Sequence, residues 1–311
     1  VIDSCVNRGF VTTGYGSSLS TTNYCGGITG YLSGASGSST GTMIINSVNE
    51  GSISAAAKTN VYVGGLVGYT VNGVTVNNSC NKGAISAPDA ASAAAVYAGG
   101  LVGCGTDSYM VVSNCYNAGN VGNTEAANTN LNALAGGPVK GSVNACYAAS
   151  GSCDSLLNMD SAGTAAGIGV FDAEGKMTAA EGYTLLYEGI TDLGQLLNRW
   201  ILSNVTSDAD YCLWEKDASG NLMPAGEVVA GAAAPSVSVS ASAMMAAKGT
   251  PITLKAEISA PEHRQGTTSL SWQWYVSDFS TKKNPVALEG EGASGRTNEL
   301  STTAEYVIDG E

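Results

Sequence analysis

Residues that commonly carry out catalysis are rare in this chain. Its single histidine, His263, lies in the segment 261–266, which is predicted to be a loop between strands. No Ser-His-Asp or Cys-His arrangement can be assembled around it. Neither a His-Glu-x-x-His pair nor a phosphate-binding glycine loop occurs. The sequence therefore predicts a protein that is not an enzyme and that needs no cofactor.

Carboxylates are also sparse in the first half of the chain. Enzymes that cleave polysaccharides need a pair of carboxyl groups at the scissile bond, and on a β-helix such groups would gather on one face. Two acidic turns, 172–175 and 217–221, lack the spacing of a calcium-binding loop and are predicted to be ordinary turns, so no metal site is predicted. The acids of residues 1–150 do not recur at matching places in the repeats: Asp3, Glu50, Asp89, Asp107 and Glu125.

Eight cysteines would suffice for four disulfides. Cys5, Cys115 and Cys146 occupy equivalent places in successive repeats, where Ser47 and Ser79 replace them. A position that accepts either Ser or Cys behaves as a small buried side chain, so we expect most thiols to be free and internal. No Cys-x-x-Cys pair is present, which argues against a structural zinc site.

The charge balance narrows the range of partners. The formal net charge is −13, with 13 basic and 26 acidic residues. Nucleic acid binding depends on Lys and Arg that neutralise phosphates, so nucleic acid is excluded as a partner. No apolar run reaches the roughly 18 residues of a membrane helix, so we expect no membrane insertion. An acidic composition suits an extracellular protein.

Glycine-rich repeats organise the first 150 residues. Gly-Gly-Leu-(aliphatic)-Gly is found at Gly64–Gly68 and Gly99–Gly103, and each copy is followed by an Asn-x-Gly signature. A weaker copy begins at Gly26, and a worn last copy is expected at Gly136-Gly137, with Pro138 where leucine should be. The glycine pairs are 35 to 38 residues apart, a period typical of stacked structural units.

These repeats lack helix formers and are rich in β-branched residues, Tyr, Asn and Gly, which favours short strands. We predict three strands per repeat, around 96–103, 109–116 and 119–122 in the best copy, stacked as an all-β parallel solenoid. Leu101 should then stack on Leu66 and Leu66 on Ile28, and Tyr31 and Tyr69 should share a column with Cys104. The column Asn7, Asn49, Asn81 and Asn117 is either a polar binding groove or, as we favour, an internal hydrogen-bonded ladder.

This pattern resembles the GLUG motif, which occurs in tandem in bacterial surface proteins that include adhesin-like proteins and the non-catalytic parts of IgA-cleaving proteases. The resemblance covers residues 1–150 and is strongest at Gly64–Ile85 and Gly99–Val121. It implies a right-handed parallel β-helix and an extracellular interaction role. Because the chain begins inside a repeat, we expect a monomeric fragment of a larger surface protein.

Residues 151–227 are predicted to form a C-terminal cap that covers the last coil. Thr191–Leu202 has an apolar helical face with Thr191 as N-cap, and 211–224 should form a hairpin that carries Trp214. Residues 228–235 are expected to form a linker, and 236–311 resemble a bacterial immunoglobulin-like β-sandwich that is either truncated or completed elsewhere. The residues expected to maintain these structures are Gly64, Gly65, Leu66, Gly68, Asn81, Gly83, Gly99, Gly100, Leu101, Gly103, Asn117, Gly119, Trp200, Trp214, Trp272 and Trp274.

The sequence thus suggests a cell-surface adhesin module that recognises a host protein or glycoprotein, with immunoglobulin as a specific candidate by analogy. Insertions in solenoids gather on one face and often bind partners, so the candidate loops are 14–23, 32–41, 87–94 and 122–132. Two alternatives stay open. A passive structural stalk would have no shared exposed patch, whereas a glycan-binding or carbohydrate-active β-helix would have an acidic or aromatic cluster along one face.

Overall fold

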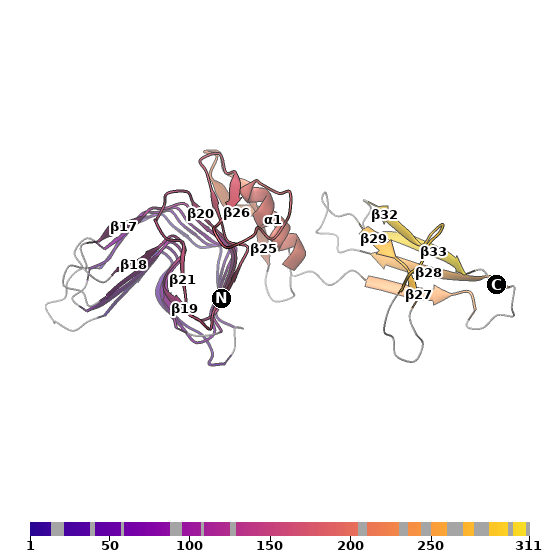
Figure 1. Cartoon of the computed structure of the whole chain (residues 1–311), viewed down its shortest axis with the longest axis horizontal. Helices are drawn as coiled ribbons and strands as arrows, with labels where there is room; N and C mark the ends of the chain where they lie inside the picture. The colour runs from indigo at the N-terminus through magenta and orange to yellow at the C-terminus, as the bar shows by residue number, and fades with distance from the viewer. Residues whose placement is uncertain are drawn as a thin grey trace. The chain divides into compact units, whose positions relative to one another are not determined.

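The chain folds almost entirely as β-structure in a computed structural model, with one 12-residue helix among the described residues (Figure 1). It divides into two compact units: unit 1 is Val1–Asn204 with Tyr211–Val228, and unit 2 is Val229–Glu311 with Val205–Asp210. The division after Val228 falls at the start of the expected linker, of which 230–235 lie outside the described residues. The structure describes residues 1–13, 22–37, 41–56, 59–87, 95–106, 109–124, 129–204, 210–229, 236–243, 250–259, 270–276, 286–297 and 301–308.

Unit 1 is built around a β-solenoid whose consecutive coils pair strand by strand in parallel, as predicted. Its strands form four sheets, named A to D here, and each sheet is built from strands of successive coils (Figure 1). Sheet A contains β1 (Ile2–Asp3), β2 (Val6–Asn7), β6 (Met43–Ile45), β7 (Val48–Asn49), β11 (Thr75–Asn77), β12 (Cys80–Asn81), β16 (Val111–Asn117), β20 (Ser142–Ala149), β22 (Thr164–Ala166), β23 (Gly169–Phe171) and β24 (Met177–Ala179).

The other three sheets have one strand from each coil that they cross. Sheet B contains β3 (Val11–Thr12), β8 (Ile53–Ser54), β13 (Ile85–Ala87) and β17 (Val121–Thr124). Sheet C contains β4 (Asn23–Gly26), β9 (Asn60–Gly64), β14 (Ala95–Gly99) and β18 (Thr129–Asn132). Sheet D contains β5 (Thr29–Ser33), β10 (Val67–Val71), β15 (Val102–Gly105), β19 (Ala135–Val139) and β21 (Leu157–Met159).

Each coil passes through four sheets, and in the first three coils the passage through sheet A is split into two strands, so these coils contain five strands where the repeat pattern predicts three. The segment 96–103, expected to be a single strand, is β14 followed by β15. The chain leaves sheet C at Gly99 and enters sheet D at Val102, because the Gly-Gly-Leu motif forms the turn between these sheets. The repeat pattern predicts the motif and glycines at corners, but it includes this motif in one strand, whereas the structure has it between two sheets.

An aliphatic column fills the interior beside this corner. Backbone hydrogen bonds connect Ile28 to Leu66, Leu66 to Leu101 and Leu101 to Leu134, and the three leucines are at most 1% exposed. Leu134 therefore occupies the place at which Pro138 was expected. The last repeat lies four residues earlier than predicted, because Asn132, rather than Gly136, pairs with Gly99.

The second glycine of the motif and the asparagine column occupy neighbouring space. A Cβ on Gly65 would lie 2.3 Å from the side-chain carbonyl carbon of Asn81, far inside van der Waals contact. In the last copy Ala133 replaces the glycine and Ala148 replaces the asparagine. The two motifs change together, because a methyl group fits only where the amide has been lost. The same close approach occurs in other coils between Gly27 and Asn49 and between Gly100 and Asn117.

Parallel pairing continues beyond residue 150, where the cap was expected to begin. β21 extends sheet D, and β22 and β23 extend sheet A alongside β20. The next strand, β24, runs antiparallel to β23. This strand therefore lies at the end of sheet A, the position that the prediction had assigned to the helix and hairpin.

The helix and hairpin instead lie along the side of the solenoid, against sheet A (Figure 1). We call α1 (Leu193–Asn204), β25 (Tyr211–Lys216) and β26 (Leu222–Val229) the helix–hairpin element. Asp192, rather than Thr191, caps the helix by accepting a hydrogen bond from the Gln195 amide. The predicted apolar face is confirmed, with Leu193, Leu196, Leu197, Trp200 and Ile201 buried.

Unit 2 consists of antiparallel strand pairs. One sheet contains β27 (Ser236–Ala241), β28 (Ile252–Ser259) and β33 (Ser301–Ile308), and two further pairs join β29 (Leu270–Gln273) to β32 (Ser294–Thr297) and β30 (Tyr275–Val276) to β31 (Val286–Ala287). Trp272 and Trp274 are both half-buried, and Trp272 pairs with Gly295 across β29 and β32. No helix in the described part of the chain is long and apolar enough to span a bilayer.

Candidate functional site

The predicted asparagine column is an internal ladder. The amide nitrogen of Asn7 donates to Asn49 over 2.7 Å, Asn49 donates to Asn81 over 2.6 Å, and Asn81 donates to Asn117 over 2.7 Å. The last three residues are 0% exposed. Each amide also donates to the carbonyl of the Asn-x-Gly glycine two residues on, for example from Asn81 to Gly83. Because these polar groups are paired within the fold, the column is structural and offers no binding groove.

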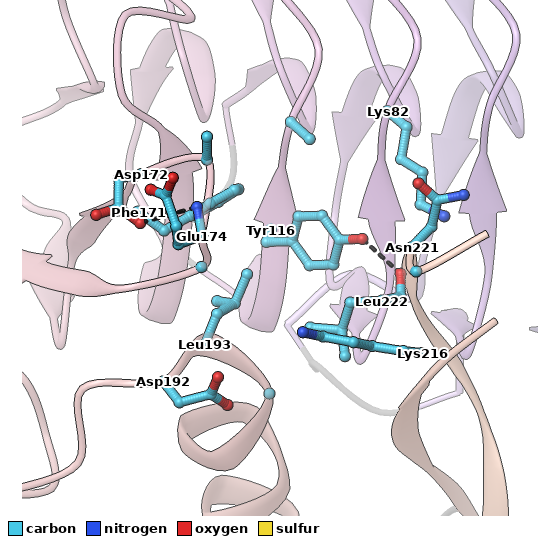
Figure 2. A pocket seen from close by; sticks show the side chains of 15 residues that line it. Lys82, Tyr116, Phe171, Asp172, Glu174, Asp192, Leu193, Lys216, Asn221 and Leu222 are labelled. Atoms are coloured by element: carbon cyan, nitrogen blue, oxygen red, sulfur yellow. Dashed lines mark hydrogen bonds between the residues drawn. The ribbon is translucent and has the colours of Figure 1, made fainter. Parts of the chain in front are cut away.

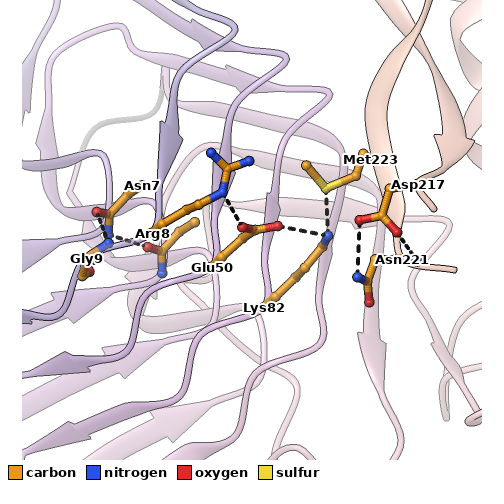
Figure 3. A network of polar contacts seen from close by, with 9 residues as sticks. Asn7, Arg8, Gly9, Glu50, Lys82, Asp217, Asn221 and Met223 are labelled. Atoms are coloured by element: carbon orange, nitrogen blue, oxygen red, sulfur yellow. Dashed lines mark hydrogen bonds and ion pairs between the residues drawn. The ribbon is translucent and has the colours of Figure 1, made fainter. Parts of the chain in front are cut away.

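A column of alternating charge follows the ladder on the outside of the coils (Figure 3). Glu50 lies between Arg8, at 3.0 Å, and Lys82, at 3.6 Å. The Lys82 ammonium also contacts the Met223 sulfur of β26. Arg8 is largely exposed, so the Arg8–Glu50 pair contributes little stability. Glu50 is the one carboxylate among these three side chains and is shared by the two cations, so the column joins neighbouring coils and helps to hold the hairpin.

A second asparagine ladder, absent from our predictions, lies at a corner of sheet A. Asn46, Asn78 and Asn114 adopt left-handed backbone conformations, with φ of 51°, 46° and 53°. Asn114 donates to Asn78 and Asn78 donates to Asn46, over 2.9 and 2.7 Å. Asparagine tolerates this conformation better than most residues. The recurring Asn-x-x-Asn spacing of 46–49, 78–81 and 114–117 was the available sequence signal.

The helix–hairpin element docks on this second ladder. The Cys212 amide donates to Asn46, and the Asn78 side chain donates to the Cys212 carbonyl. Trp214 packs against Tyr116 with ring centroids 5.3 Å apart, and the Tyr116 hydroxyl donates to the Leu222 carbonyl over 2.6 Å. Trp214 thus performs the packing role that the sequence suggested, but between the hairpin and the flank of the solenoid.

A cavity of about 280 Å³ remains between the helix–hairpin element and the solenoid (Figure 2). Lys82 and Lys216 lie on one side of Tyr116, and Asp172 and Glu174 lie on the other. Several of its polar groups already have partners in the fold: the Tyr116 hydroxyl binds Leu222, and Asp172 accepts backbone hydrogen bonds from its own turn. The cavity is therefore best explained as a consequence of docking.

Five cysteines are buried free thiols: Cys25, Cys80, Cys104, Cys115 and Cys146. Cys115 and Cys146 pair in register, which confirms the predicted equivalence. Burial raises the pKa of the Cys80 thiol to about 12 and that of Cys25 to about 11. A thiol kept protonated in this way is a poor nucleophile, so these cysteines act as small core side chains.

The most distinctive exposed feature of unit 1 is a cluster of five tyrosines on sheets C and D. Tyr24, Tyr62 and Tyr97 align in sheet C, and Tyr31 and Tyr69 align in sheet D with Cys104. We call these five residues the tyrosine surface. Tyr24 is 38% exposed and Tyr31 is 49% exposed, while the other three are half-buried.

The rings contact one another within and between the two sheets. Within sheet C, Tyr62 stacks on Tyr97 with centroids 5.1 Å apart and on Tyr24 at 5.4 Å. Between the sheets, Tyr62 meets Tyr69 edge to face at 4.9 Å, and Tyr24 meets Tyr31 at 5.3 Å. Offset and edge-to-face aromatic pairs are each worth roughly 0.5–1.5 kcal/mol beyond their burial.

Strand alternation and the glycine turn create this surface. In β9 Val61 and Val63 are fully buried, which leaves Tyr62 on the outside of the sheet. The turn brings sheets C and D together closely, since a Cβ on Gly68 would lie 2.6 Å from the Cys25 amide nitrogen. Burial, together with the neighbouring Cys104 and tyrosines, raises the pKa of Tyr62 to about 12.

The sequence contained a partial signal for the surface. The Tyr31–Tyr69–Cys104 column was predicted and is confirmed. The second column was not predicted, although a tyrosine two residues before each of the first three Gly-Gly pairs, as in Tyr62-Val63-Gly64, marks it. Only the tight turn between the sheets reveals that the two columns form one cluster.

The four candidate loops receive little support as binding elements. Much of them, 14–21, 38–40, 88–94 and 125–128, lies outside the described residues, as does His263. The stretch 122–132 is not simply a loop, because β17 and β18 occupy its two ends. The predicted acidic turns are ordinary turns in which Asp172 and Asp217 accept backbone hydrogen bonds.

Comparison of the chain with protein-family models found no match, and searches of curated proteins and of solved structures found none either.

Proposed function

We propose that this chain is a non-catalytic recognition module of a bacterial surface protein, and that it binds a host protein or glycoprotein through the tyrosine surface. One observation carries the proposal: five tyrosines from two sheets form a continuous, partly exposed aromatic cluster. Tyrosine is enriched at binding interfaces because it supplies large contact area with few rotatable bonds.

The resemblance of residues 1–150 to GLUG repeats supports an extracellular, cell-surface location and a right-handed coil. The alternating strands and paired tryptophans of unit 2 support an immunoglobulin-like spacer. Immunoglobulin is a specific candidate ligand, because similar repeats accompany IgA-directed surface proteins. The competing hypothesis of a passive stalk predicts no shared exposed patch, and the tyrosine surface counts against it.

The test measures binding of the full chain to immobilised immunoglobulin A, immunoglobulin G and mucin. A Tyr24→Ser/Tyr31→Ser variant removes the two most exposed rings of the surface, and Tyr275→Ser in unit 2, which is 57% exposed, is the matched control. Circular dichroism verifies that each variant folds. We expect retention of at least one glycoprotein by the wild type and the control, with loss in the double variant. Equal retention by all three chains, or by none, would exclude recognition through the tyrosine surface.

A further inference from the structure

The geometry of the tyrosine surface limits what it can bind. Tyr62 and Tyr97 are stacked with their planes 6° apart, Tyr24 and Tyr62 with planes 18° apart, and Tyr31 and Tyr69 with planes 21° apart. Stacked rings cover each other's faces. Along the columns a ligand therefore meets ring edges and phenol hydroxyls, repeated at the coil spacing of about 4.8 Å, whereas Tyr24 and Tyr31 in the first coil have a parallel stacked neighbour on one side only.

The described part of this surface is uncharged. The neighbouring position of the sheet C column is Asn130, which pairs in register with Tyr97, and the sheet D column continues to Cys104. A phenol is neutral at pH 7 because its usual pKa is about 10, and burial raises the pKa of Tyr24 and Tyr62 further. Charged partners are recognised by complementary charge, which these residues do not supply. Hydroxyl and amide groups instead favour a neutral ligand rich in hydroxyls.

The arrangement is also periodic along the stacking direction. Tyr24, Tyr62 and Tyr97 present the same group in three consecutive coils, and Asn130 continues their column with an amide that the Asn158 side chain approaches at 3.5 Å. Tyr69 has a hydroxyl partner in Thr106 at 3.1 Å. A linear polymer of hydroxylated rings can contact an equivalent group in each coil, whereas a folded protein surface has no such repeat.

We propose that the tyrosine surface binds a neutral, unbranched glycan chain lying along the stacking direction of the coils. This inference rests on the proposed recognition function and specifies its ligand class. A host glycoprotein would then be held through its sugar rather than through its polypeptide. Tyrosine hydroxyls and asparagine amides would hydrogen-bond sugar hydroxyls, and the rings would make van der Waals contact with the C–H groups of the sugars.

The experiment titrates the full chain with neutral oligosaccharides of one to six units, by calorimetry. The panel covers glucose, N-acetylglucosamine, mannose and galactose chains, with oligogalacturonate as the charged comparison. For at least one neutral series, affinity should rise with length up to about the number of coils that bear tyrosine and then level off. Tyr62→Phe/Tyr97→Phe keeps the stack but removes two hydroxyls, and it should weaken binding about tenfold, whereas Tyr275→Phe should not.

Three outcomes would overturn the glycan assignment: no binding to any neutral series, tighter binding to oligogalacturonate than to every neutral chain, or unchanged affinity in Tyr62→Phe/Tyr97→Phe. Enzymatic removal of glycans from mucin and immunoglobulin A separates this inference from the function on which it rests. If the deglycosylated proteins are still retained, and retention still depends on Tyr24 and Tyr31, recognition of a protein stands and the glycan ligand fails. If no form of mucin, immunoglobulin A or immunoglobulin G is retained and no neutral oligosaccharide binds, both proposals fail.

Discussion

Ala145 interrupts the second asparagine ladder, and replacing it with asparagine should stabilise unit 1. Ala145 pairs with the same strand position as Asn114, because Cys115 and Cys146 are in register. It has a left-handed φ of 49° and is 0% exposed. The side-chain oxygen of Asn114 is buried and has no hydrogen-bond partner among the described residues. In Ala145→Asn, the new amide nitrogen would donate to that oxygen, as Asn114 donates to Asn78.

Two contributions determine the magnitude. A residue with a Cβ in the left-handed region costs roughly 1–2 kcal/mol, and asparagine tolerates this region far better than alanine. A net hydrogen bond contributes about 1 kcal/mol, and pairing a buried orphan acceptor removes its desolvation penalty. The space needed for one amide group sets the opposing cost. We therefore expect a gain of about 1–2 kcal/mol in the free energy of unfolding.

Urea unfolding followed by tryptophan fluorescence measures this gain. A Trp272→Phe/Trp274→Phe background restricts the signal to Trp200 and Trp214 of unit 1. With a slope of about 2–3 kcal/mol per M, the midpoint should rise by roughly 0.5 M. Ala145→Gly is the control, since it relieves the backbone strain without adding an amide. If Ala145→Asn gains no more than Ala145→Gly, the ladder argument is wrong, and if both lose stability, so is the strain argument.

Three further predictions concern the interior of unit 1. Gly65→Ala and Asn81→Ala should each destabilise unit 1, but the double variant should be at least about 1 kcal/mol more stable than the sum of the two single effects predicts. The reason is that the alanine pair at 133 and 148 shows that a methyl group fits at the glycine position once the asparagine amide is lost. Strictly additive effects in urea unfolding would contradict this prediction. The pKa of the Cys80 thiol is about 12 in the folded state and 9.0 when unperturbed, so the thiol is protonated in both states below pH 9. Above pH 9 the unfolded state loses this proton first, and the free energy of unfolding should fall by about 1.4 kcal/mol per pH unit towards pH 12. The fall should be shallower in Cys80→Ala, and identical pH profiles of the two proteins would reject burial of Cys80 as the cause. At pH 8, a thiol reagent should label the exposed Cys5 rapidly, and it should label Cys80 and Cys115 only when the protein unfolds. If Cys80 and Cys115 are labelled in the native protein as fast as Cys5, the coils open readily and the prediction is wrong.

The sequence was sufficient to predict the solenoid, its aliphatic column and its first asparagine ladder. Each depends on a periodic pattern, and parallel stacking converts a period along the chain into a column in space. Leu66 above Leu101 and Asn81 above Asn117 therefore followed directly from their spacing. The apolar face of α1 was predictable for the same reason, because its spacing is local to one helix.

The tertiary structure alone decided the features that depend on contacts between different parts of a coil. Pairing of Leu134 with Leu101, rather than the visible Gly136-Gly137, fixed the last repeat. The helix–hairpin element lies on the flank because Asn46 and Asn78 there offer hydrogen bonds to Cys212, a relation with no sequence period. The tyrosine surface arises because glycines at the corner let two sheets approach until their rings touch, and such proximity is a property of the folded coil rather than of any repeat.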